Sequence, residues 1–196
     1  MILLLLAVSL IAAEASPQNW TGQYPPCDRH PDLLSPGAMD LGVRISTSNP
    51  ALARQFENAL DFWSGVLDLE WHEEDSQNCS VQVVDGAPDL FDSVGSCSCI
   101  SARSQVPDRP AFQGWIAFNP GVRLTEREMF VASVHEIGHL LGLPHNPSGS
   151  SVMFFLKVEG SLSLDEADLE ALASRHKLRT GVFEKGATKV SPITIP

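Results

Sequence analysis

His135 and His139 are four residues apart in the sequence. On a helix this spacing puts both imidazoles on one face, where two nitrogens can bind a single metal ion. A catalytic zinc site has a third protein ligand and one open position for water. His145 is the candidate third ligand, because Gly142 tolerates the left-handed backbone at which the helix can end and the chain can turn back. Glu136 can then reach a metal-bound water without binding the metal.

Two histidines on an amphipathic helix often only pack or form hydrogen bonds, so the short pattern H-E-x-x-H leaves that alternative open. Residues 135–145 extend the pattern to H-E-x-x-H-x-x-G-x-x-H, which fixes five residues in eleven. A purely structural zinc site is a weaker alternative, because three histidines leave the coordination shell open. The extended pattern resembles the long zinc motif of the metzincin metalloproteases.

Helix signals predict the elements that position this motif. Thr125 and Glu128 form a capping box, which predicts the start of the metal-binding helix. Upstream, Asn49 can cap an earlier helix, and Ser163-x-x-Glu166 is a second capping box that predicts a third. Apolar residues repeat at helical spacing in the upstream helix and are expected to form core: Leu52, Phe56, Ala59, Leu60 and Trp63.

Strands are predicted where apolar residues alternate or cluster over short segments. These segments are residues 41–45, 67–71, 81–83 and 115–118, with a short edge strand at 99–102. A chain of 196 residues suits one domain that can bury a substantial core.

The N-terminal residues 1–15 have the features of a secretory signal peptide: an apolar run too short to span a bilayer, then a small-x-small cleavage site. A short membrane anchor is the competing interpretation, and no later stretch is long and apolar enough to span. We expect an irregular segment at 16–38 with room for a short propeptide, one domain at 39–180, and a flexible tail at 181–196.

The net charge of −11 argues against nucleic acid and anionic membrane surfaces as partners, because both would repel the protein. The chain has an even set of cysteines: Cys27, Cys79, Cys97 and Cys99. Behind a signal peptide, such a set predicts two disulfides, although free buried thiols remain an alternative. Cys97 and Cys99 are too close to be expected partners, so each would pair with one of the other two.

Other sites in the sequence have weaker signals. Glycosylation sequons occur at Asn19 and Asn78 and have meaning only in a eukaryotic protein. Calcium could bind the acidic side chains of the loop 85–96, namely Asp85, Asp89 and Asp92. Their spacing matches no dedicated calcium motif, which favours a solvated acidic loop. The remaining histidines are scattered and are interpreted as surface or packing residues: His30, His72 and His176.

From Met39 to Leu178, the predicted order of elements resembles the catalytic domain of the matrixin branch of the metzincins. The stretches F-x-x-A-L-x-F-W and L-x-L-x-W between Phe56 and Trp71 are similar to the first helix and second strand of matrixins. The resemblance implies an α/β fold of the α+β metzincin type: a twisted, mostly parallel five-stranded sheet with an antiparallel edge strand, three helices and a Met-turn. It also implies that Met153 lies beneath the histidines.

Some positions depart from the matrixin pattern. Asn146 stands where matrixins usually have serine, and Phe154-Phe155 replaces a proline and a tyrosine that often line the specificity pocket. The histidine-containing loop that holds a second, structural zinc in vertebrate matrixins is not recognisable. These differences affect the branch assignment and substrate preference that the resemblance implies.

The resemblance implies a secreted zinc-dependent endopeptidase that acts on protein or peptide substrates as a monomer. In that function His135, His139 and His145 bind one zinc ion, Glu136 is the general base, and an extended substrate lies antiparallel to the edge strand near Cys99. The alternative is a catalytically silent, secreted metal-binding or adhesion protein on the same scaffold. The intact glutamate argues against that alternative, because a binding module needs no proton shuttle.

Two residues of the segment 16–38, Cys27 and Asp28, could inhibit the zinc site and keep the enzyme latent. Pro26-Cys27-Asp28 is vaguely similar to the cysteine switch of matrixin propeptides, in which a thiolate occupies the fourth position on zinc, but the usual glycine is missing. Asp28 could act similarly through its carboxylate. The even cysteine count instead favours a disulfide for Cys27.

Overall fold

The computed structural model describes residues 39–73, 79–91, 98–105, 111–155, 160–179 and 192–196. The expected signal peptide, the N-terminal segment and the asparagines of both sequons lie outside these residues, as do Cys27, Cys97, His30 and Asp92. Cys79 and Cys99 lie within strands, but their side chains are not described. The disulfide and glycosylation predictions therefore stay predictions. None of the described helices has the length and apolar character needed to cross a membrane.

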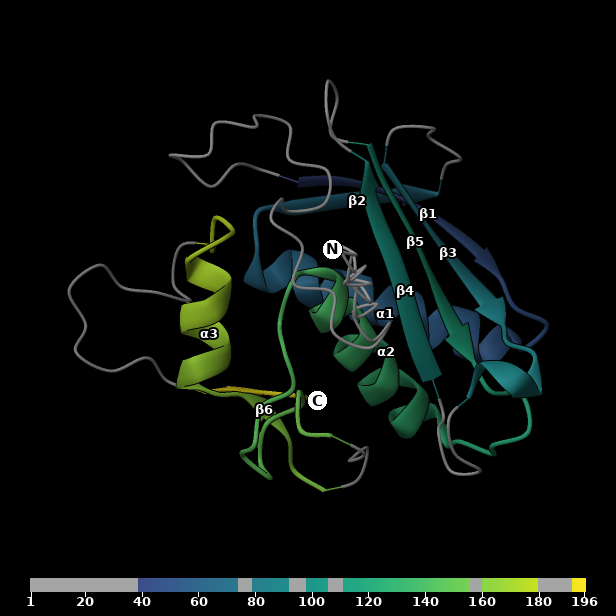
Figure 1. Cartoon of the computed structure of the whole chain (residues 1–196). Coiled ribbons are helices and arrows are strands. Elements are labelled where there is room, and N and C mark those ends of the chain that lie inside the picture. Colours follow the sequence, from purple (N-terminus) through teal and green to yellow (C-terminus); the bar gives the residue numbers. More distant parts are fainter. Residues whose placement is uncertain (1–38, 74–78, 92–97, 106–110, 156–159, 180–191) are drawn as a thin grey trace, which may run out of the picture.

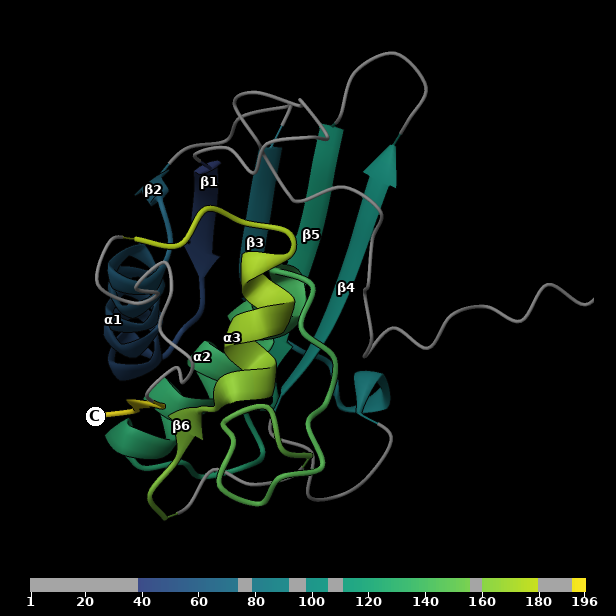
Figure 2. The ribbon, with the colours of Figure 1, turned by 90° about the vertical axis from the view of Figure 1, so that its left-hand side faces the viewer.

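A single five-stranded sheet forms the frame of the molecule, with the order β2-β1-β3-β5-β4. Its strands are β1 (Met39–Ser46), β2 (Leu69–Glu73), β3 (Cys79–Asp85), β4 (Ser98–Gln105) and β5 (Ala111–Phe118). All neighbours pair in parallel except β4, which runs antiparallel to β5 at the edge. This arrangement confirms the expected fold class. Figures 1 and 2 show α1 and α2 on one face of the sheet and α3 farther away.

Helix α1 (Pro50–Val66) begins where the sequence predicts. The side chain of Asn49 accepts hydrogen bonds from the backbone N–H groups of Ala51 and Leu52, and Pro50 occupies the first turn, where its missing N–H has no cost. The predicted apolar stripe of this helix is buried: Leu52, Phe56, Ala59, Leu60 and Trp63. Burial of each such large side chain stabilises the fold by roughly 1.5–3 kcal/mol.

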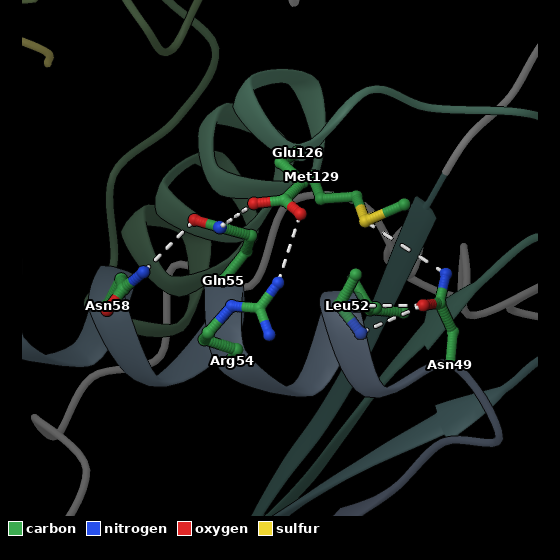
Figure 3. Close-up of polar contacts among 8 residues, drawn as sticks. Asn49, Leu52, Arg54, Gln55, Asn58, Glu126 and Met129 are labelled. Carbon is green, nitrogen blue, oxygen red and sulfur yellow. Dashed lines mark hydrogen bonds and ion pairs between the residues drawn. The ribbon is translucent and has the colours of Figure 1, made fainter.

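Helix α2 (Glu126–Leu140) packs beside α1. Between them, the Nε1–H of buried Trp63 donates to the carbonyl of Val134 at 3.1 Å. Figure 3 shows further polar contacts at the start of α2, where Glu126 accepts from Arg54 at 3.0 Å and from Gln55 at 3.1 Å. These groups are exposed, and such pairs are worth about 0–1 kcal/mol, so apolar packing holds the two helices together.

The capping box of α2 is present as predicted: Thr125 Oγ1 accepts from the N–H of Glu128, whose carboxylate accepts from the N–H of Thr125. The predicted box Ser163-x-x-Glu166 is wrong. Helix α3 (Glu166–Ala173) is capped by Asp165, with Asp168 completing the box, because Ser163 belongs to strand β6 (Ser163–Leu164).

The C-terminal residues differ in part from the expected flexible tail. Residues 180–191 lie outside the described chain, but Ile193–Thr194 forms strand β7, which pairs antiparallel with β6. Ile195 is buried, and its N–H donates to the carbonyl of Leu162 at 2.8 Å. The apolar Ile193 and Ile195 explain why this end of the chain binds to the domain. The second predicted strand is also displaced, since Leu67 makes only an isolated bridge with Leu178.

Candidate active site

The three motif histidines converge in the structure. Nε2 of His139 lies 3.0 Å from Nε2 of His135 and 3.1 Å from Nε2 of His145. One ligand atom of each residue lies within 4.8 Å of the others. Tetrahedral bonds of 2.0–2.1 Å to zinc would separate two nitrogens by about 3.3 Å. The arrangement therefore needs only small adjustments to hold such an ion.

Hydrogen bonds on the far side of the rings fix which nitrogen carries the proton. Nδ1 of His135 lies 2.7 Å from the carbonyl oxygen of Val152, and Nδ1 of His139 lies 2.8 Å from that of Leu143. A carbonyl only accepts, so Nδ1 is the donor in each ring and Nε2 of the neutral ring has a lone pair. Lone pairs only 3.0 Å apart repel each other. A cation between them removes this repulsion, so the donor set fits a metal ion.

Burial keeps these imidazoles neutral. It lowers the pKa of His139 to about 3, with the nearby charge of His135 adding to the effect. Burial likewise lowers the pKa of His135 and of His145. Metal binding requires the unprotonated ring, so all three rings are ready to bind at neutral pH.

The turn after α2 brings His145 to the other two rings. Gly142 has φ of +91°, a left-handed conformation that favours glycine. The N–H of Gly142 donates to the carbonyl of His139 at 2.9 Å, and the N–H of Leu143 donates to the carbonyl of Gly138 at 2.9 Å. These bonds satisfy carbonyl groups in the last turn of the helix. The helix itself ends at Leu140, two residues before Gly142.

Met153 is fully buried, and its sulfur lies against Gly138 of the metal-binding helix. A Cβ at Gly138 would lie 2.5 Å from the sulfur of Met153, so any larger residue here would force the methionine side chain to move. Sequence analysis missed Gly138. The sequence does carry a signal for this contact, because Gly138 is a glycine inside a predicted helix. A glycine there destabilises the helix by about 1 kcal/mol relative to alanine, which indicates that another element packs closely against it.

A second missed group connects the third histidine to α3. The side-chain amide of Asn146 donates to Oδ1 of both Asp165 and Asp168 at 2.9 Å. The other oxygen of Asp168 accepts from Ser151 Oγ, which in turn accepts from the N–H of Met153. Burial raises the pKa of Asp168, and the donors Asn146 and Ser151 oppose that shift. The network links the loop after His145, the Met-turn and the start of α3.

Glu136 directly follows the first histidine on α2 and lies in a nearly dry environment. It is 5% exposed, and its Oε1 accepts a hydrogen bond from Ser98 Oγ at 2.6 Å. Burial raises its pKa to about 7, while the Ser98 bond acts in the opposite direction. A carboxyl group with a pKa near neutrality can both accept and release a proton at physiological pH. Sequence analysis did not identify Ser98.

The remaining candidates are not part of this cluster. Asp85 accepts hydrogen bonds from Thr47 and Ser48, so it joins the end of β3 to the turn before α1. Among the described residues, the histidine triad is the only group of three or more acidic, histidine or cysteine residues arranged to bind an ion. His176 is buried, and its Nε2 lies 2.7 Å from the carbonyl of Leu141, so it packs as expected.

An exposed aromatic ring borders the site. Phe155 is 48% exposed, and its ring centroid lies 5.0 Å from that of His145 in an edge-on arrangement. A large apolar side chain open to solvent beside a polar site can contact a ligand.

Comparison with known proteins places these features in context. The sequence profile of the family described as Matrixin matches residues 43–176. No curated protein sequence gives a significant match. A solved structure of high choriolytic enzyme 1, a hatching enzyme zinc-protease from Oryzias latipes (Medaka fish), is similar at 18% identity with a TM-score of 0.36. The match covers 55% of this chain and 46% of that chain, less than half of its length.

Proposed function

The chain belongs to the matrixin family of peptidases, and from that premise we propose that it is a secreted, zinc-dependent endopeptidase. The observation that carries the proposal is the convergence of three imidazole rings, with a buried glutamate directly after the first of them in the sequence. Secretion is supported by the apolar run at 1–15 and the even cysteine count. N-terminal sequencing of protein exported from a eukaryotic host should show cleavage after Ala15, and an uncleaved, cell-retained protein would contradict this part.

His135, His139 and His145 would hold the zinc ion through Nε2. When bound, zinc supplies Lewis-acid activation of a water molecule and of the scissile carbonyl. The backbone carbonyls of Val152 and Leu143 keep the first two rings in the correct tautomer and orientation.

Glu136 provides the acid–base chemistry. As the attacking water forms its bond to the carbonyl carbon, a carboxylate oxygen of Glu136 accepts the proton that the water loses. The same carboxyl group then gives this proton to the nitrogen of the leaving amine when the peptide bond breaks. Burial raises the pKa of Glu136 in the metal-free protein, which favours uptake of a proton by this carboxylate.

Strand β4 offers a place for the substrate backbone. It is the edge of the sheet, bonded to β5 along one side, and it passes Glu136 at Ser98. An extended peptide can add to such an edge through backbone hydrogen bonds, which do not depend on sequence. Phe155 beside His145 would contact a substrate side chain and favour apolar residues there.

The test combines zinc analysis with cleavage of unstructured substrates. Purified protein should contain one zinc per chain and cleave casein or gelatin until a chelator is added. His139→Ala should lose both zinc and activity, because it removes the central ligand. Protein that binds zinc but cleaves nothing, even after removal of the segment before Met39, would favour the catalytically silent binding protein instead.

A further inference from the structure

We propose that Ser98 is a positioning residue for Glu136, holding Oε1 of the carboxylate so that Oε2 is the oxygen that exchanges the proton. This inference rests on the proposed function. Its observation is the 2.6 Å hydrogen bond from Ser98 Oγ to Glu136 Oε1.

The bond is the main polar restraint on a buried side chain. Glu136 is 5% exposed, and within the described part of the chain its carboxylate forms no other hydrogen bond. A glutamate has three rotatable side-chain bonds, so apolar packing alone would leave its carboxylate free to rotate. A short bond from a hydroxyl to a charged oxygen is among the stronger hydrogen bonds in proteins. Ser98 therefore selects one orientation of the carboxylate.

The position of Ser98 is fixed by the sheet. It is the first residue of β4 and lies opposite Phe118 in the antiparallel ladder with β5. Phe118 is buried and contacts the ring of Phe56 on α1 in an edge-on arrangement, with centroids 6.3 Å apart. The hydroxyl is thus carried by a strand anchored to the core, while Glu136 is carried by α2. Figure 1 shows β4 and α2 next to each other.

This geometry connects the general base to the strand on which we expect the substrate to bind. The O–H bond of the attacking water breaks, its proton goes to Oε2 of Glu136, and that proton later leaves on the amine nitrogen. The Ser98 hydroxyl keeps its own proton throughout and donates to Oε1 in every state. Strand β4 would therefore bind the substrate backbone and, through Ser98, also hold the carboxylate of Glu136. Contact with the same strand keeps the substrate and the general base aligned with each other.

The experiment compares Ser98→Ala, Ser98→Thr and the wild type. Ser98→Ala removes the donor, and we expect kcat to fall roughly 10-fold to 100-fold with little change in KM or zinc content. Ser98→Thr retains the hydroxyl and should restore most of kcat. Ser133→Ala is the matched control, because its buried hydroxyl bonds only to the carbonyl of Met129 within α2. It should behave as wild type.

Calorimetric binding of a peptide hydroxamate to the zinc-loaded proteins gives a readout without turnover. The hydroxyl of the hydroxamate needs an oriented Glu136 carboxylate as its partner. The Ser98→Ala protein should therefore bind the hydroxamate more weakly than wild type, and the Ser98→Thr protein should bind it as tightly as wild type. A Ser98→Ala protein with wild-type kcat, or one that loses zinc along with activity, would overturn the positioning role. A wild-type protein with no chelator-sensitive cleavage would instead defeat the proposed function.

Discussion

The side-chain amide of Asn146 donates a 2.9 Å hydrogen bond to Oδ1 of Asp168, which ties the residue after the third histidine to the first turn of α3. Asp168 also accepts from Ser151, the residue that holds the Met-turn backbone at Met153. One buried carboxylate therefore supports two segments of the site from a helix that contributes no metal ligand. Supports of this kind commonly change metal affinity 10-fold to 100-fold when they are removed.

Asp168→Ala should weaken zinc binding by about 10-fold or more and lower the free energy of unfolding, because it removes the acceptor of Ser151 and one of the two acceptors of Asn146. Competition with a chromogenic chelator measures the affinity. Glu170→Ala is the control, since Glu170 lies exposed on the same helix. Equal zinc affinities in the two variants would show that the network does not support the site.

Gly138→Ala should destabilise the protein by roughly 1–3 kcal/mol, because the added Cβ would lie 2.5 Å from the sulfur of Met153. Urea unfolding measures the change. Gly65→Ala is the matched control: Gly65 also lies in a helix, but a Cβ there meets nothing within 4 Å. That variant should gain about 0.5–1 kcal/mol from helix propensity. Destabilisation of both variants by the same amount would contradict the packing explanation.

In the chelator-treated, metal-free protein, His139 and Glu136 should have opposite effects on how the free energy of unfolding changes with pH. His139 takes up a proton near pH 6.5 when unfolded but only near 3 when folded, so acidification below 6.5 favours unfolding. Glu136 takes up a proton near 7 when folded but near 4.5 when unfolded, so acidification from 7 to 4.5 favours folding.

Removing the glutamate should expose the histidine effect. Between pH 6.5 and 4.5, Glu136→Gln should lose stability more steeply than wild type, by up to about 1.4 kcal/mol per pH unit for one proton. Urea midpoints at several pH values, all with chelator present, give the two curves. Parallel curves would mean that Glu136 is not protonated in the folded, metal-free state.

The regular elements could be predicted because local signals and burial agree. Asn49 and Thr125 cap helices with their own side chains, and the stripe that includes Phe56 and Trp63 repeats at helical spacing. The start of α3 was predicted wrongly, because Ser163-x-x-Glu166 also matches the capping-box pattern while the true cap is Asp165. Pairing of β6 with β7 places Ser163 in a strand instead, and that pairing joins residues 29 and 31 positions apart in the sequence.

The candidate site was predictable where its members share one motif and not where they come from distant segments. His135, Glu136, His139 and His145 lie within eleven residues, and the structure brings the three histidines together. Ser98 is 38 residues from Glu136, and it meets the carboxylate only because of the register between β4 and β5. No local pattern marks such a residue, so the three-dimensional arrangement was needed to find it.

In the proposed function, Glu136 performs the acid–base steps beside a zinc ion held by the three histidines. The most direct test measures cleavage of casein by wild type and Glu136→Gln at equal zinc occupancy. Because Glu136 is not a ligand, the variant should retain its zinc and fold, while its rate falls roughly 100-fold to 10,000-fold. A zinc-loaded Glu136→Gln protein that cleaves casein as fast as wild type would contradict the account.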